Sequence, residues 1–575
     1  MDRAFAPHPS VAYFSMEIAL DASLPTYSGG LGVLAGDLLK SAADLALPML
    51  GVTLVYQHGY FVQRLDANGS QSEVSDSWDP RARLVPMEPV VTVEIEGRSV
   101  RVRAWRFDLI GASGAIVPIY LLDTDVDGND ANDRLLTSAL YGGDERYRLA
   151  QEIVLGYGGF AMLRALGLES DIATFHMNEG HAALLVPAAL ESRMDARGAN
   201  EPGGDDIARL RRRFVFTTHT PVPAGHDRFD RGLMRAFVGE RREKLIETLG
   251  GIRDGVVNMT QLALRGSHYV NGVAMRHGEV SRLLFPGDEI HAITNGVHAG
   301  RWTSPAFKTL FDRHIASWRS DNGYLRHAIG IPLEEVAAAH RAAKDDLAVE
   351  VLQRTGVKLD TSRLTVGFAR RAAEYKRGFL AFSDPERLRA IAATAGPLQF
   401  VFGGKAHPRD EGGKDVIRRI FEAAAQLGDA VRFVYLENYE MAIAQRLVAG
   451  VDLWLNTPRP PLEASGTSGM KAALNGVPSL STLDGWWVEG CVEGHTGWAI
   501  GDGATHSVEA DATDAELLYE KLEREIVPLY YGDPAGYARV MRGAIALNAS
   551  YFNTHRTIEQ YVRSAYLGGV TEPKS

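Results

Sequence analysis

Cysteine is almost absent from this sequence of 575 residues, in which Cys491 is the only one. A single thiol excludes an internal disulfide framework and a thiolate metal cluster, and it fits a reducing compartment. An excess of basic residues is absent too, since 61 lysines and arginines stand against 72 aspartates and glutamates, a formal net charge of −11. The charge balance therefore gives no long-range attraction for nucleic acid or for an anionic membrane.

Long apolar runs are also missing. The apolar stretch at 49–56 is far shorter than the roughly 20 residues that cross a bilayer. Glu17 and Asp21 interrupt the apolar residues that follow Val11 before a signal-peptide core could form. The sequence has no short repeat and no low-complexity tract. We therefore expect a soluble, cytoplasmic protein, and a chain of this length predicts at least two domains.

What the sequence does contain is a repeated succession of short β-rich runs and long amphipathic stretches. The β-rich runs lie at 117–122, 214–218, 289–294, 364–368, 399–402 and 431–436, and long helical stretches lie at 148–166 and 333–352. Strand, crossover and strand in succession predict parallel sheets covered by helices, an α/β fold. The turn at Asn295 and Gly296 is the candidate boundary between two α/β halves, 1–296 and 297–575. Two such halves facing each other would form a deep cleft beyond the carboxyl ends of their strands.

A glycine- and hydroxyl-rich segment at 461–476 follows the expected strand at 451–455. Such a loop, opening a helix, presents unpaired backbone N–H groups and the positive end of the helix dipole, which together hold an anion. Lys471 lies in the first turns of that helix. A lysine partly removed from water has a lowered pKa and can form an imine with an aldehyde cofactor. Taken alone, an exposed surface lysine is the commoner explanation.

A second cluster follows the expected strand at 364–368 and contains the four cations Arg370, Arg371, Lys376 and Arg377. Cations at a strand end lower the cost of bringing two phosphates together, and guanidinium groups suit phosphate geometry. By itself the cluster is equally consistent with a solvated basic turn.

Two further features lie in the first half. The glycines at 27–37, before an expected helix, let the backbone approach a ligand closely and point its N–H groups at phosphate. His219 stands at the end of the strand that begins at Phe214, although an isolated histidine is more often structural than catalytic. Metal binding is the alternative for the histidines, but no two stand at convincing zinc spacing with carboxylate partners, so no metal site is expected.

Together these segments resemble the glycogen and starch phosphorylases. The 461–476 segment is similar to the lysine segment that holds pyridoxal 5'-phosphate in that family, and the block at 374–377 is similar to its phosphate site. Further matching blocks follow in the family order at 13–17, 178–181, 266–274, 402–406 and 436–439, so the resemblance covers nearly the whole chain. It implies the GT-B glycosyltransferase architecture, in which two Rossmann-like, doubly wound lobes face a cleft and the last helix packs back on the N-terminal lobe.

The resemblance also assigns roles to individual residues. The implied cofactor-binding residues are Lys471, which carries the imine, together with Arg370, Tyr439, Thr467, Ser468 and Gly30. The implied substrate-binding residues are Glu463, Ser465 and Gly466 for the terminal glucose, Asn295 for its 4- and 6-hydroxyls, His219 for its 6-hydroxyl, and Tyr375 and Gly29. Arg371 and Lys376 are implied to bind inorganic phosphate and to form the catalytic set with Lys471 and His219.

The function implied is that of an α-1,4-glucan phosphorylase. In that family inorganic phosphate removes the terminal glucose of a glucan as α-glucose 1-phosphate, with retention, and the cofactor phosphate is the proton shuttle. Two alternatives are a retaining glycosyltransferase that uses a nucleotide sugar and a non-catalytic glucan-binding homologue. The first is disfavoured because such enzymes carry a second glutamate eight positions after the first, where this chain has Lys471 after Glu463.

Three departures from the family pattern concern control and gating. Only a dozen residues precede Tyr13, so the regulatory N-terminal extension of animal enzymes is expected to be absent. The 141–144 segment is shorter than the family's active-site gate and leaves its asparagine without a counterpart. Glu440 stands where larger members carry an arginine near the cofactor phosphate. The preferred glucan (glycogen, starch or maltodextrin) and the oligomeric state, a homodimer included, stay open.

Overall fold

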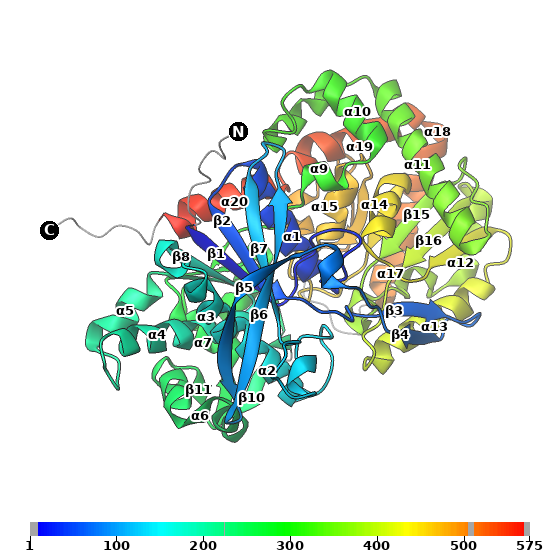
Figure 1. The fold of residues 1–575 in the computed structure, drawn as a ribbon. Helices are drawn as coiled ribbons and strands as arrows, with labels where there is room; N and C mark the ends of the chain where they lie inside the picture. The colour runs from blue at the N-terminus through cyan, green and yellow to red at the C-terminus, as the bar shows by residue number, and fades with distance from the viewer. Residues whose placement is uncertain (1–9, 223–224, 504–510, 568–575) are drawn as a thin grey trace.

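The computed structural model of the chain describes residues 10–222, 225–503 and 511–567 (Figure 1). Two large sheets, one of nine strands and one of six, form its core together with the helices packed on them. The predicted α/β class with parallel sheets is confirmed.

The nine-stranded sheet takes all its strands from the first half of the chain. Its order is β14-β13-β9-β8-β1-β2-β7-β6-β5, parallel from β14 to β7 and antiparallel from β7 to β5. The strands are β1 (Val11–Ser15), β2 (Met49–Leu54), β5 (Val85–Ile95), β6 (Arg98–Ile110), β7 (Ile116–Asp123), β8 (Thr174–Asn178), β9 (Phe214–Thr217), β13 (Tyr269–Gly272) and β14 (His291–Ala292).

Both faces of this sheet are buried along its central parallel strands. Along β1, Phe14 packs in a cluster with Phe175, whereas its neighbour Tyr13 packs in another cluster with Leu38 and Tyr561. Successive side chains of a strand point to opposite faces, so the two clusters lie on the two sides of the sheet. Burial on both sides explains why the parallel strands read as continuous apolar runs.

The six-stranded sheet belongs to the second half and is parallel throughout. Its order is β17-β16-β15-β18-β19-β20, so the chain proceeds outward from β15 in one direction and then returns to fill the other side. The strands are β15 (Leu364–Ala369), β16 (Leu398–Gly403), β17 (Val431–Leu436), β18 (Leu453–Asn456), β19 (Ser479–Thr482) and β20 (Gly497–Ile500).

The chain passes between the two sheets twice, and the two passages lie side by side. Val297, which follows β14, forms a parallel bridge with Asn553, just before helix α20 (Thr554–Tyr561). Helix α20 then packs against α1 (Gly30–Asp44), where the hydroxyl oxygens of Ser41 and Thr554 are 2.6 Å apart (Figure 1). Helix α20, near the end of the described residues, is thus tied to α1, near their beginning.

A hairpin from the first half reaches the second. Strands β3 (Val62–Leu65) and β4 (Gln71–Val74) lie beside helix α13 (Glu411–Ala425) (Figure 1). The Gln63 amide nitrogen donates to the Gly404 carbonyl at 2.8 Å, and Arg64 pairs with Glu437 at 2.7 Å. The hairpin therefore links the first half of the chain to the loops after β16 and β17.

Two expected elements differ in extent. Only residues 291 and 292 of the expected strand at 289–294 pair, because β14 is an edge strand with a single short neighbour, β13. The helix expected at 148–166 is continuous but contains a π-helical turn at Val154–Gly158, between α2 (Glu145–Ile153) and α3 (Gly159–Ala165).

Buried His176 joins the last turn of the chain to the nine-stranded sheet and predicts an acid-sensitive fold. Its Nδ1 lies 2.8 Å from the Tyr566 hydroxyl and its Nε2 lies 2.8 Å from the Thr217 hydroxyl. Burial lowers the pKa of His176 to about 3, so the folded protein holds it neutral. Keeping the ring neutral costs nothing above the ordinary histidine pKa of about 6.5, but the folded state loses stability as the pH falls from there towards 3. The expected loss in the free energy of unfolding is about 2 kcal/mol at pH 5.

Urea denaturation at pH 7.5 and pH 5 tests this prediction. Wild type should lose more unfolding free energy on acidification than His176→Gln, which has no proton to take up at this position. Equal losses in the two proteins would show that His176 is not the group responsible.

Candidate active site

The candidate site lies where the order of the six-stranded sheet reverses. Strands β15 and β18 are parallel neighbours, so the loops that follow them leave the sheet side by side. Ligands bind at such reversal points in open parallel sheets. The loop after β15 carries Arg370 and Lys376, and the loop after β18 carries Glu463.

Glu463 brings these two loops together. One carboxylate oxygen, Oε2, accepts from Arg370 Nη2 at 2.6 Å and also pairs with Lys376 Nζ. All three side chains are about nine-tenths buried. Arg370 Nε and Nη1 are buried and have no hydrogen-bond partner among the described residues. The site thus keeps unused guanidinium N–H groups in a largely desolvated place, as an anion site requires.

The electrostatics of Glu463 follow from its neighbours. Burial alone would raise the pKa of Glu463, but Arg370 and Lys376 outweigh it and hold that pKa at about 2. Asp484, buried behind it, accepts the Glu463 N–H at 2.8 Å and the Gly485 N–H at 2.9 Å. Burial raises the pKa of Asp484 to about 7. Of the two acids, Glu463 is therefore the one that is fully ionised at neutral pH.

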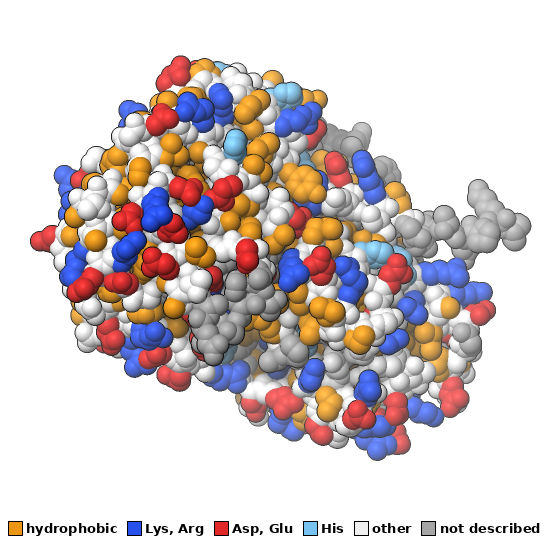
Figure 2. All heavy atoms as spheres, turned by 180° about the vertical axis from the view of Figure 1, so that it is seen from behind, with side chains coloured by type: hydrophobic (Ala, Val, Ile, Leu, Met, Phe, Trp, Pro, Cys, Tyr) orange, Lys and Arg blue, Asp and Glu red, His pale blue; other side chains and the backbone are white. Residues whose placement is uncertain are grey.

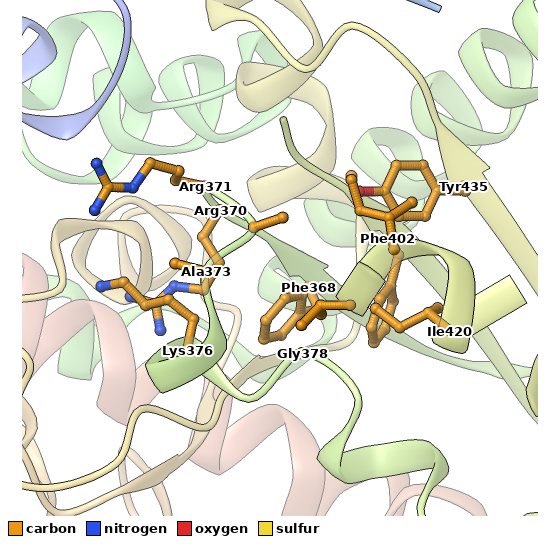
Figure 3. A pocket seen from close by; sticks show the side chains of 13 residues that line it. Phe368, Arg370, Arg371, Ala373, Lys376, Gly378, Phe402, Ile420 and Tyr435 are labelled. Carbon is orange, nitrogen blue, oxygen red and sulfur yellow. The ribbon is translucent and has the colours of Figure 1, made fainter. Parts of the chain in front are cut away.

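A pocket flanks the cations (Figure 3). Apolar side chains form one wall, and the nitrogen ends of the cations point away from it. The labelled lining residues include Phe368, Phe402, Ile420 and Tyr435 on the apolar side and Arg370, Arg371 and Lys376 on the other. Arg371 is exposed and makes no ion pair within the described ranges. It therefore remains available to a ligand.

Arg377, the fourth cation of the cluster, is not part of this group. It is buried, has a left-handed φ of +48°, and donates to the carbonyls of Thr457 and Pro458. Its guanidinium also pairs with Asp511 at 2.9 Å and Asp514 at 2.7 Å. Arg377 therefore fixes the loop after β18, and three of the four cations remain for ligands.

Lys471 lies in helix α15 (Thr467–Ala473) and is buried. Its Nζ stands 4.0 Å from the centre of the Trp302 ring, whose indole N–H donates to Asp37 at 2.7 Å. Burial lowers the pKa of Lys471 to about 8; nearby Asp37 opposes this shift and Arg301 adds to it. The lowered pKa increases the unprotonated fraction of the amine, to about a tenth at pH 7, and the unprotonated amine is the form that reacts with an aldehyde.

The other predicted residues of the 461–476 segment differ in their availability. Ser468 is engaged internally, because its hydroxyl accepts from Trp454 at 3.1 Å and donates to Asn456 at 3.3 Å. Ser465 is buried, and its hydroxyl has no partner in the described structure. Gly466 has a φ of +86° and begins the helix that Thr467 enters. Only the Ser465 hydroxyl is thus buried and still free to bind.

The glycine loop of the first half precedes α1. Glu17 Oε2 accepts the N–H groups of Ser28 at 2.6 Å and Gly29 at 3.2 Å, which fixes the loop from behind. A side chain at Gly29 or Gly30 would meet nothing within 4 Å. Tyr27, in the same loop, accepts the Met441 N–H at 3.0 Å. The contact between Tyr27 and Met441 therefore holds the glycine loop next to the segment that follows β17.

His219 and Asn295 stand at strand ends of the nine-stranded sheet. His219 Nε2 lies 2.6 Å from the Asn178 amide oxygen, and Asn178 in turn donates to Ser15. Burial lowers the pKa of His219 to about 3, which keeps the ring neutral and leaves Nδ1 as an acceptor. Asn295 is buried, and its amide oxygen has no partner in the part of the chain that the structure describes. Each offers an acceptor for a ligand hydroxyl.

The two predicted tyrosines lie near the cations. The ring of Tyr375 is 4.5 Å from Lys376 Nζ. Tyr439 is half-buried beside Gly403, and burial together with Tyr27 raises its pKa far above the ordinary value, against the opposing charge of Arg370. The Tyr439 hydroxyl therefore stays protonated at neutral pH.

Several residues with clear roles in this geometry have no separate motif. Glu17, Asn178 and Asp484 act by holding other residues, as described above, and Trp302 covers Lys471. Glu17 and Asn178 lie in blocks that the sequence resemblance includes, but their supporting contacts cannot be read from the spacing of residues along the sequence.

Within the described residues no group of histidine, cysteine, aspartate and glutamate could hold a metal ion. Nor does any described helix combine the length and apolarity that a membrane crossing needs.

Comparison with known proteins gives consistent matches. The sequence model of the carbohydrate phosphorylase family matches residues 16–105 and 226–497. A maltodextrin phosphorylase of Thermococcus litoralis is 41% identical, across 97% of this chain and 70% of its own length. Glycogen phosphorylases of Mycobacterium tuberculosis and Aquifex aeolicus are each 36% identical across 97% of this chain, and 70% and 86% of their own lengths are covered. The matched ranges include the glycine loop, the cations and Lys471.

Proposed function

The chain belongs to the carbohydrate phosphorylase family and is an α-glucan phosphorylase, and we propose that it works with pyridoxal 5'-phosphate held at Lys471. The reaction is the transfer of the terminal α-1,4-linked glucose of a glucan to inorganic phosphate. The observation that carries this proposal is the contact of Glu463 with both Arg370 and Lys376. It places a carboxylate that can accept hydrogen bonds from sugar hydroxyls beside two cations that can bind phosphate, in one buried site.

The two sheets suit a two-lobed GT-B architecture with a boundary after Gly296. The first lobe, 1–296, would then supply the glycine loop, His219 and Asn295, and the second, 297–575, the cations and Lys471. The contact between Tyr27 and Met441 and the β3–β4 hairpin span the two sides. This arrangement would close the reacting sugar between two rigid sheets and keep water out.

The residues present fit the cofactor. Lys471 offers a buried amine with a pKa of about 8, and Arg370 offers the N–H groups of two unpartnered nitrogens, Nε and Nη1. The Cβ positions of Gly29 and Gly30 face open space, so the backbone of this loop can approach a ligand closely. When bound, pyridoxal phosphate supplies a phosphate group that exchanges a proton with the substrate phosphate.

The chain's own residues then have three tasks. Arg371 and Lys376 hold inorganic phosphate and offset the repulsion between anions in a poorly hydrated site. Glu463 uses its second oxygen, and Ser465 its hydroxyl, to orient the glucose. His219 and Asn295 accept hydrogen bonds from the hydroxyls at the far side of the ring. Inorganic phosphate gives its proton to the departing glycosidic oxygen and bonds to C1 on the same face, which retains the α-configuration.

The direct test is an assay of purified, cofactor-loaded protein with maltooligosaccharides of increasing length. α-Glucose 1-phosphate should form only when inorganic phosphate is present, and the dependence on chain length identifies the preferred glucan. Release of free glucose without phosphate, or no product at all, would refute the proposal.

Alanine substitutions at Gly30 and Gly36 distinguish a glycine needed to bind the cofactor from a glycine needed for folding. Gly30→Ala is expected to change the free energy of unfolding by less than about 0.5 kcal/mol, since the new methyl group meets no protein atom within 4 Å. It should nevertheless weaken cofactor retention during dialysis, because the methyl group would occupy open space in the loop that we propose to bind the cofactor. Gly36→Ala is the contrast: its Cβ would lie 2.0 Å from the Ala19 carbonyl oxygen, so this variant should unfold at lower temperature. Wild-type retention of cofactor by Gly30→Ala would contradict the assignment of Gly30.

A further inference from the structure

The turn formed by Thr294, Asn295 and Gly296 is fixed from several sides. The Asn295 N–H donates to the Val273 carbonyl at 3.0 Å. A Cβ on Gly296 would lie 2.3 Å from backbone atoms of Asn553, so the two chain passages touch directly here. In spite of this tight fit, the amide oxygen of Asn295 is buried without a partner. The turn therefore presents a fixed but unused acceptor.

Arg556, on helix α20, holds the backbone of this turn. Its Nη1 donates to the Thr294 carbonyl at 2.6 Å, and its Nη2 donates to the Asn295 carbonyl at 2.9 Å. Its Nε donates to the Tyr551 carbonyl at 2.9 Å, and Nη1 also reaches the Gln560 side chain at 2.8 Å. The guanidinium thus clamps two successive carbonyls next to the free amide.

The clamp is not an ion pair. Within the described residues, no carboxylate lies within salt-bridge distance of Arg556, and carbonyl and amide oxygens take its N–H groups. Burial lowers the pKa of Arg556 to about 10, so the group is still charged at neutral pH. A partly desolvated charge that is not directly paired with a carboxylate is costly unless its donors are well used. The role that accounts for this arrangement is to fix the carbonyls themselves.

A second contact from the other half supports the same turn. The Thr294 hydroxyl donates to Glu489 at 2.8 Å, and Glu489 also accepts the Met275 N–H at 3.0 Å. Among the described residues, the other hydrogen bonds to this turn, apart from the one between Asn295 and Val273, come from residues that follow it by about two hundred positions or more.

We propose that Arg556 is a positioning residue for the sugar site: it holds the Thr294 and Asn295 carbonyls so that the Asn295 amide faces the hydroxyls of the bound glucose. The last helix of the chain thereby takes part in substrate recognition although it does not touch the substrate. This inference rests on the proposed function, in which Asn295 binds the terminal glucose.

A double-mutant cycle tests the proposal. The variants are Asn295→Ala, Arg556→Met and the combination, each assayed for kcat/KM with glucose 1-phosphate in the direction of glucan synthesis. Each single change is expected to lower kcat/KM by at least about tenfold, the scale of one lost substrate hydrogen bond. If Arg556 acts through Asn295, the double variant should lose no more than about twofold beyond Asn295→Ala alone.

Two controls separate positioning from a general loss of stability. Arg542→Met removes another half-buried arginine of the C-terminal region, one that donates to the Ile331 carbonyl at 3.0 Å, and it should leave kcat/KM unchanged. Arg556→Lys keeps the charge and one donor, and it should recover part of the activity. Because Arg556→Lys disturbs the fold less, it also serves in the cycle should Arg556→Met fail to fold.

The outcomes are distinguishable. Losses that multiply in the double variant, or an Arg556→Met enzyme with wild-type kinetics and only a lower melting temperature, would overturn the positioning role. A wild-type protein that forms no glucan from glucose 1-phosphate would instead refute the proposed function, whatever the variants do.

Discussion

Lys471→Ala is expected to give a folded, colourless protein with no measurable phosphorolysis. The substitution removes the buried amine that stands 4.0 Å from the Trp302 ring and so removes the attachment point of the cofactor. Loss of a group that the whole reaction depends on costs at least about 10⁴-fold in kcat. The measurements are the absorbance spectrum of the purified protein and α-glucose 1-phosphate release from maltooligosaccharides.

Lys405→Ala is the matched control for this variant. Burial also lowers the pKa of Lys405 to about 8, but its amine already donates to the Phe61 carbonyl at 2.9 Å. A lowered pKa by itself therefore does not distinguish the two lysines. The Lys405 variant should keep the borohydride-reducible chromophore. Phosphate-dependent activity in Lys471→Ala without cofactor would contradict the assignment of Lys471.

Lys376→Met should have the second-largest effect, on both activity and stability. In the folded protein Glu463 has two cationic partners, and the variant leaves Arg370 as the only one. Breaking a buried ion pair from one side costs about 3–5 kcal/mol. Removing a charge that stabilises phosphate in the transition state costs about 10²–10³-fold in rate. We expect a higher KM for phosphate, a lower kcat and a lower denaturation midpoint.

Lys344→Met separates the two effects. Lys344 is also buried and pairs with Asp452 at 2.6 Å, outside the candidate site. This variant should lose stability on the same scale but keep the wild-type KM for phosphate. If the two variants show the same kinetic change, the effect of Lys376 is one of stability and not of phosphate binding.

Much of the fold could be predicted from the sequence, because parallel strands that are buried on both faces appear in it as short apolar runs. Strands β15, β16 and β17 read as short apolar runs and are found where they were expected. The long antiparallel pair β5 and β6 was not predicted. Its β5 side chains alternate between exposed positions and partly or fully buried ones, so the pair gives no continuous apolar run that would mark it in the sequence.

The site was predictable as a set of residues but not as a set of contacts. Glu463 was expected to bind sugar and Lys376 to bind phosphate, yet the two pair directly, which no spacing along the chain reveals. Arg377 belongs to the same cationic segment as Lys376, but its left-handed backbone turns it into a separate network. Arg556 lies far from every motif, and only the return of the last helix to α1 brings it to Asn295.

The central claim is that a pyridoxal phosphate group is attached at Lys471. The most direct measurement is mass spectrometry of peptides from protein that was reduced with borohydride and digested. The account predicts one reduced pyridoxyl phosphate group, located on the peptide that contains Lys471, in protein that forms α-glucose 1-phosphate. An active protein in which that peptide is unmodified, or in which the group sits on another lysine, would contradict it.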